Sequence, residues 1–226
     1  MISLKSSTFV ATPAYRGDVV MQYAHSICRD AVLSLAKGHF VEAPHFINDT
    51  YIHIARNRAV KTFMAGTWDY LMLVDADMGW EKDALSSILS LPADMDIVGG
   101  VYAVKETPAR YPINLLPDTP LKFPICELAG IATGFMRISR ACIEKMLQRF
   151  PNGRLFDHIV DDRDVEWGDD MAFCIRARKA GCRVWGKFDI EFEHVGPFAW
   201  KGRASDDMKS SLGAMLAPGD IVEAVA

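Results

Sequence analysis

Tyr70-Leu-Met-Leu-Val-Asp75-Ala-Asp77 is the stretch of this sequence that decides the fold. Its first five residues form a continuous apolar run, which is typical of a strand buried on both faces of a parallel sheet. The two aspartates follow at once, so they lie just past the carboxyl end of that strand. Open α/β sheets bind their ligands at this edge. The stretch therefore predicts a central parallel strand that ends in a ligand site.

The segments around this strand alternate between two patterns. Apolar residues at helical spacing predict helices, and short apolar runs predict strands. The elements expected up to residue 100 are strand 7–11, helix 19–37, strand 39–42, helix 52–64, strand 70–74, helix 82–91 and strand 96–100. This alternation predicts a single Rossmann-like α/β domain, with a mostly parallel central sheet flanked by helices.

The pattern is looser beyond residue 101. Five prolines interrupt residues 107–124, so we expect a surface segment there. The remaining expected elements are strand 131–138, helix 139–150, an acidic loop at 157–168, helix 170–179 capped by Asp169, strands 182–186 and 189–192, and a weakly ordered tail.

Composition narrows the class of protein. The chain has 226 residues, of which 50% are hydrophobic and 24% charged, as in an ordinary globular domain. Its net charge of -4 gives no global basic field toward nucleic acid or acidic membranes, although a local basic patch is not excluded. The five cysteines are scattered without a C-x-x-C pair, and no apolar run approaches 18 residues. We therefore expect a cytoplasmic protein with reduced thiols, no export leader and no membrane span.

Three groups of residues carry candidate chemistry. Asp75 and Asp77 offer the carboxylate oxygens that Mg²⁺ and Mn²⁺ prefer, although an Asp-rich surface turn has the same composition. Asp169 and Asp170 stand together at a predicted helix start, where one carboxylate suffices as a cap and the second is free to accept a proton. His194 follows the last predicted strand, where a chain reversal would return it to the metal; a lone histidine is more often a packed or solvent-exposed residue.

In this order and spacing, these features resemble the GT-A-type glycosyltransferases, close to the family 2 group and to small transferases of bacterial and phage genomes. The resemblance runs from about Phe9 to Gly202. Asp75-Ala-Asp77 resembles the family's Asp-x-Asp motif, Ala55-Arg-Asn57 its A-R-N motif, and His194-Val-Gly196 its late metal-binding histidine. The sequence departs from the family at Asp169, where glutamate is more usual, which leaves open which carboxylate faces the acceptor.

The resemblance implies a metal-dependent glycosyltransferase that moves a sugar from a nucleotide-sugar donor, with a UDP-sugar favoured, to an acceptor hydroxyl with inversion. It implies Mn²⁺ or Mg²⁺ held by Asp75, Asp77 and His194, and Asp170, beside Asp169, as the catalytic base. The residues expected at the donor are Thr12, Pro13, Ala14, Tyr15, Arg56, Asp75, Ala76, Asp77, Lys105 and Gly134. Lys201 or Arg203 is a further candidate for positive charge near the diphosphate, although a solvated lysine or arginine is the more common case.

The same resemblance divides the expected domain, residues 1–204, into a nucleotide-binding half at about 1–105 and an acceptor and catalytic half at about 106–204, followed by a tail at 205–226. Two alternative functions stay open: a nucleotidyltransferase of related fold, and a non-catalytic module that binds nucleotide-sugars. The sequence does not identify the acceptor, which leaves a saccharide, a lipid-linked sugar, a protein side chain or a modified DNA base. The oligomeric state is equally open.

Overall fold

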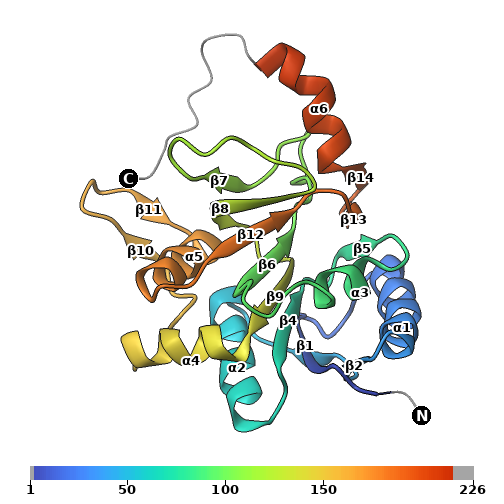
Figure 1. The fold of residues 1–226 in the computed structure, drawn as a ribbon, viewed down its shortest axis with the longest axis vertical. Helices are drawn as coiled ribbons and strands as arrows, with labels where there is room; N and C mark the ends of the chain where they lie inside the picture. Colours follow the sequence, from blue (N-terminus) through green and yellow to red (C-terminus); the bar gives the residue numbers. More distant parts are fainter. Residues whose placement is uncertain (1–2, 216–226) are drawn as a thin grey trace.

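The computed structural model describes residues 3–215, with side chains described as far as Lys209 (Figure 1). Its centre is a nine-stranded sheet. The order across the sheet is β2 (His39–Val41), β1 (Ser6–Pro13), β4 (Tyr70–Val74), β9 (Phe135–Ser139), β6 (Ile97–Gly100), β12 (Val184–Lys187), β8 (Ile125–Ile131) and β7 (Ile113–Leu115), with β3 (His45–Ile47) also paired to β1.

Most strands of this sheet share one direction. β1 runs parallel to β2, β3 and β4, and β6 runs parallel to β12. β9 lies between β4 and β6 and is antiparallel to both, while β8 is antiparallel to β12 and β7. The predicted α/β class with a mostly parallel central sheet is therefore confirmed.

Helices cover both faces of the sheet because the central strand is apolar on both faces. Leu71 and Leu73 face a core cluster that includes α2 (Ile52–Ala65), α4 (Arg140–Arg149) and α5 (Asp169–Lys179). Met72 and Val74 face the opposite cluster with α1 (Met21–Ala36) and α3 (Ala84–Leu89). Figure 1 shows α1 and α3 on one side of the sheet and α2 and α4 on the other.

Smaller elements complete the chain. A three-stranded sheet has the order β14 (Ala199–Arg203), β13 (Glu191–Val195), β5 (Met78–Trp80), and a hairpin joins β10 (Ile159–Val160) to β11 (Glu166–Trp167). α6 (Ala204–Met215) follows β14 directly. All five cysteines are free, and only Cys28 is exposed. Among residues 3–215, no helix is both long and apolar enough to cross a bilayer.

Several predicted elements were wrong. The strand expected at 131–138 is two strands, because β8 ends at Ile131, β9 begins at Phe135, and the chain turns at Thr133-Gly134. β3, β5 and β14 were not predicted, β7 lies inside the expected surface segment, and the acidic loop contains the β10–β11 hairpin. Gly168, not Asp169, is the N-cap of α5. The start of the predicted tail is helical in α6, and residues 216–226 of that tail lie outside the described part of the chain.

Candidate active site

The candidate site lies where the carboxyl ends of β1, β4 and β6 meet. β9 is antiparallel to β4, so its first residue, Phe135, pairs with Val74 at the same edge. The turn that precedes β9 is thereby placed beside Asp75, whose backbone N–H donates to the Gly134 carbonyl at 3.0 Å. One edge of the sheet thus carries both the aspartate pair after β4 and the turn before β9.

Arg56, on α2, organises the carboxylates of this edge. Its Nη2 donates to both oxygens of Asp75 at 3.0 and 3.2 Å, and its Nη1 donates to Asp170 at 2.6 Å and also contacts Asp169. The Arg56 side chain is only 3% exposed. Burial disfavours its charge, but Asp75, Asp170 and Asp169 outweigh this and raise the pKa of Arg56 above its ordinary value. A single guanidinium therefore fixes three carboxylates that come from two elements.

Asp170 is held by two donors on one oxygen. Its Oδ1 accepts from Arg56 and, at 2.5 Å, from the hydroxyl of the buried Thr133. Within the described residues, its Oδ2 has no hydrogen-bond partner. The side chain of Asp170 is 29% exposed, against 16% for Asp169. Asp170 is therefore the more accessible of the two carboxylates, and one of its oxygens is free.

Asp77 lies apart from this cluster, against His194 and Lys105. His194 Nδ1 lies 2.9 Å from the Ala103 carbonyl, which favours a hydrogen on Nδ1 and leaves the lone pair on Nε2. That Nε2 is 3.7 Å from Asp77 Oδ2, and the Lys105 ammonium contacts the same oxygen. Burial raises the pKa of Asp77, but the interactions with His194 and with the Lys105 ammonium outweigh it and lower that pKa to about 2. Asp77 is thus ionised at neutral pH.

The donor set at Asp77 fits a divalent cation in part. A carboxylate oxygen and an imidazole nitrogen with a free lone pair are accepted ligands of Mn²⁺, and the carbonyl behind the imidazole orients it as in metal sites. Asp75, predicted as a third ligand, turns to Arg56 instead. In the described part of the chain, no group of three or more His, Cys, Asp or Glu side chains is arranged to hold a metal. Asp77 and His194 thus offer two groups that could ligate a metal, and the Lys105 ammonium contacts the same Asp77 carboxylate.

A cavity of about 340 Å³ opens beside the aspartates. It is lined by Pro13, Asp18, Val19, Val20, Ile52, Asp75, Ala76 and Asp77. The other predicted residues of the first loop lie differently. Thr12 is buried and hydrogen-bonded to the Tyr23 hydroxyl at 2.5 Å, Ala14 is buried, and Tyr15 is 60% exposed. Asp18 was not predicted, because an isolated polar residue in a loop gives no sequence signal.

Tyr102 is a second residue that the sequence analysis missed. Its hydroxyl accepts from the Gly134 N–H at 3.0 Å, and its ring packs edge-on against His194 at 5.3 Å between centroids. Burial, then Asp75 and Asp170, raise the pKa of Tyr102, so the hydroxyl stays protonated. A Cβ on Gly134 would lie 2.8 Å from Tyr102 Cζ and 3.0 Å from Asp75 Oδ2. A side chain larger than that of glycine would therefore collide with Tyr102 and Asp75 at this position.

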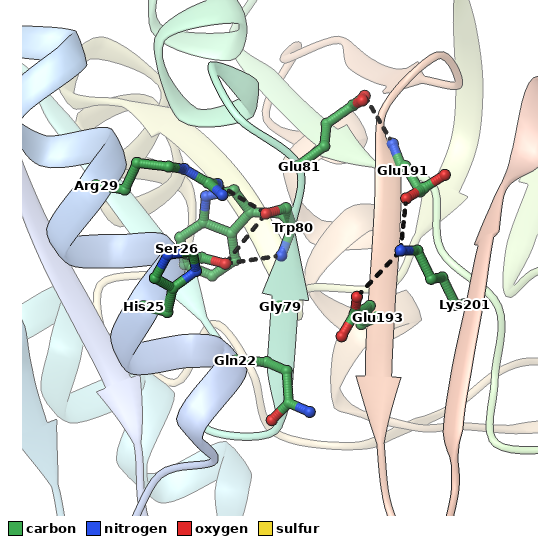
Figure 2. Close-up of a pocket in the computed structure, with 10 residues that line it drawn as sticks. All are labelled: Gln22, His25, Ser26, Arg29, Gly79, Trp80, Glu81, Glu191, Glu193 and Lys201. Carbon is green, nitrogen blue, oxygen red and sulfur yellow. Dashed lines mark hydrogen bonds and ion pairs between the residues drawn. The ribbon is translucent and has the colours of Figure 1, made fainter.

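Lys201 and Arg203 do not reach this site. Successive side chains of β13 alternate between the two faces of the small sheet, so His194 faces Asp77 while Glu193 faces the opposite side. Figure 2 shows Lys201 in the pocket on that opposite side, where it pairs with Glu191 at 3.1 Å and Glu193 at 3.3 Å. Arg203 pairs with Glu81 at 2.6 Å. Both cations thus pair with glutamates away from the carboxylate cluster of Asp75, Asp169 and Asp170.

Comparison with known proteins identifies the fold. No protein-family model matches the sequence, and no curated protein matches it. Among solved structures, the viral protein A197 from STIV matches with a TM-score of 0.55 and 19% identity, over 84% of this chain and 86% of that one. Drosophila β-1,4-galactosyltransferase 7, solved as a mutant with manganese, UDP-Gal and xylobiose, matches with a TM-score of 0.50 and 14% identity, over 84% and 71%. The chain has a GT-A-like fold, as predicted from the resemblance of its sequence motifs to those of GT-A-type glycosyltransferases.

Proposed function

We propose that this chain is a metal-dependent glycosyltransferase that transfers a sugar from a nucleotide-sugar donor, with a UDP-sugar favoured, to an acceptor hydroxyl with inversion. The observation that carries the proposal is the pairing of Asp77 with His194 Nε2 at the carboxyl edge of β4, next to the carboxylate cluster of Asp75, Asp169 and Asp170. A GT-A-like fold supports it, because in open α/β sheets this edge is the ligand site.

The charges of the site agree with a cation and a diphosphate bound together. Asp75, Asp77, Asp169 and Asp170 bring four carboxylates to this edge, and the only cations that pair with them among the described side chains are Arg56 and Lys105. A bare diphosphate would be repelled by this excess of negative charge. Asp77 and His194 could hold a divalent cation, which would offset this excess of negative charge and so allow a diphosphate to bind.

The residues have separate roles in the proposed reaction. Mn²⁺ or Mg²⁺ held by Asp77 and His194 would supply Lewis-acid stabilisation of the leaving diphosphate. Lys105, on the same carboxylate, adds positive charge beside it. Asp170 Oδ2 accepts the proton of the acceptor hydroxyl as that oxygen attacks the anomeric carbon. Arg56 and Thr133 hold Oδ1 and so fix the direction of Oδ2. One displacement of this kind inverts the anomeric centre.

Thermal unfolding tests the donor half of the proposal. The protein is heated with UDP, GDP, CDP or dTDP and the corresponding sugars, each in Mn²⁺ and in EDTA. A ligand at a hundred times its Kd stabilises by ~2.7 kcal/mol. For a chain of this length, that corresponds to a Tm increase of roughly 5–10 °C. We expect one nucleoside diphosphate to raise Tm in Mn²⁺ only, and Asp77→Asn to abolish the increase.

Asp170→Asn separates binding from chemistry. This variant should retain the Mn²⁺-dependent Tm increase and lose transfer of the radiolabelled sugar to a panel of saccharide, lipid-linked, peptide and hydroxymethylated DNA acceptors. If no nucleotide stabilises the wild type in either buffer, the donor site is wrong. If Asp170→Asn loses donor binding along with transfer, Asp170 is part of the donor site and not the base.

A further inference from the structure

A groove lies between α2 and the carboxyl end of α4, outside the candidate active site. Arg140, at the start of α4, donates to the carbonyls of Phe63 and Gly66 and ties that end of α4 to the end of α2. Figure 1 shows the two helices on the same side of the sheet. Toward the other end of α4, a cavity of about 400 Å³ is lined by Ile54, Asn57, Arg58, Val60, Lys61, Met64, Leu147, Asn152, Gly153 and Arg154. We call it the α2–α4 groove.

The floor of the α2–α4 groove is apolar. Ile54 is 36% exposed, although it lies on a helix that packs against the core, and Val60, which also lines the groove, is buried. Met64 and Leu147 are partly buried and pack against the core cluster that contains Val60. These side chains leave apolar surface in contact with water that a hydrocarbon chain would cover.

The rim of the α2–α4 groove is basic. Arg58, Lys61 and Arg154 line it, and none of its lining residues is acidic, although acidic residues outnumber basic ones in the whole chain. Two of these cations pair with carboxylates that do not line the groove: Arg58 with Asp49 at 2.8 Å, and Arg154 with Asp157 at 3.6 Å. The side chains of Arg58 and Arg154 are largely exposed, at 60% and 72%. Lys61 is exposed and pairs with no carboxylate within residues 3–209. Exposed ion pairs contribute little, so a bound anion can compete for these cations.

We propose that the α2–α4 groove binds a single-chain amphiphile with a phosphate headgroup. The phosphate lies among Arg58, Lys61 and Arg154, and the hydrocarbon chain covers Ile54, Met64 and Leu147. The apolar floor complements the hydrocarbon chain of this ligand, and the cationic rim, with no acidic lining residue, complements its phosphate. A free phosphate would leave the floor exposed, and a neutral amphiphile would leave the cations without a partner. The proposal is independent of the function proposed for the active site.

Isothermal titration of the whole protein with alkyl phosphates, below their critical micelle concentrations, tests this inference. We expect dodecyl phosphate to bind saturably at one site, with inorganic phosphate and the neutral dodecyl maltoside both much weaker. If the chain lies in the groove, affinity should rise from octyl to decyl to dodecyl phosphate, by up to about fourfold for each added methylene. Equal affinity for dodecyl maltoside, no dependence on chain length, or no binding of dodecyl phosphate would overturn the proposal.

Charge-reversal variants locate the site. Lys61→Glu/Arg154→Glu should weaken dodecyl phosphate about tenfold or more, because two attractive contacts become repulsive. Lys82→Glu/Arg110→Glu makes the same change in net charge at exposed positions outside the groove and should bind like the wild type. Met64→Gln should flatten the chain-length dependence while the headgroup preference remains. If the control pair weakens binding as much as the groove pair, the phosphate is attracted by overall charge and the groove is not its site.

Discussion

Removing the Arg56 guanidinium should destabilise the protein far more than removing any exposed arginine. In Arg56→Met, the side chains of Asp75, Asp169 and Asp170 remain together at one edge of the sheet and lose the cation that they share. Breaking a buried ion pair by deleting one partner costs about 3–5 kcal/mol. At about 2–4 °C per kcal/mol for a chain of this size, Tm should fall by roughly 6–20 °C.

Arg58→Met is the matched control, two residues along the same helix. The Arg58 side chain is 60% exposed and, among residues 3–209, pairs with Asp49 alone, so we expect a loss of no more than about 1 kcal/mol. Differential scanning calorimetry at neutral pH and moderate salt compares the two variants. Adding Asp169→Asn to Arg56→Met removes one of the repelling charges and should recover part of the lost Tm. Equal losses in the two single variants, or no recovery in the double variant, would refute the view that Arg56 holds this cluster together.

Three further outcomes follow from the same site. The pKa of Asp77 is lowered to about 2, so its ionised form contributes stability above about pH 4 that is lost as the pH falls toward 2. Asp77→Asn should therefore lower the free energy of unfolding at neutral pH by about 1 kcal/mol, after allowance for the 37% exposure of the side chain. Urea unfolding of both proteins should show this difference closing between pH 4 and pH 2. Gly134→Ala should lower the free energy of unfolding in urea by about 1–3 kcal/mol, because the new methyl group collides with Tyr102. Adding Tyr102→Phe should relieve part of that loss, because it removes the hydroxyl that the methyl group meets. If the losses of the two single variants simply add in the double variant, the contact is not the cause. Thr133→Val should lower kcat more than it raises the donor KM, because the Thr133 hydroxyl donates to Asp170 Oδ1, the oxygen that orients the proposed base. A change in KM alone would place Thr133 at the donor instead.

The parts of the fold that could be predicted from sequence are those with a strong local pattern. The apolar run before Asp75 indicated a strand buried on both faces, and the structure divides its residues between two core clusters. The helices α1 to α5 carry apolar residues at helical spacing and were found to within a few residues, whereas α6 was predicted as tail. β5 and β14 are short edge strands whose alternation spans too few residues to detect, so the small sheet that carries His194 was missed as a unit.

The site was predictable only where a motif marks it. Asp75, Asp77, Asp170 and His194 were singled out because they stand in a known order, and the structure brings Asp77 to His194 and Asp170 to Arg56. What each carboxylate contacts depends on tertiary packing. Asp75 was expected beside Asp77 on a metal, yet the buried guanidinium of Arg56 faces Asp75 instead. Tyr102 follows the unremarkable end of β6, and its role depends on a turn that was predicted as continuous strand.

The position of β9 has a consequence for how this chain folds. Leu71 in β4 and Ile97 in β6 both pair with Ile138, so the two strands of the amino-terminal half are joined through a strand from the carboxyl-terminal half. A polypeptide that ended at residue 105 would leave β4 and β6 as exposed edges, which favour aggregation. The pairing also joins positions far apart in sequence, which makes folding slow. The two halves predicted from the sequence therefore share one sheet, which must form as one cooperative unit.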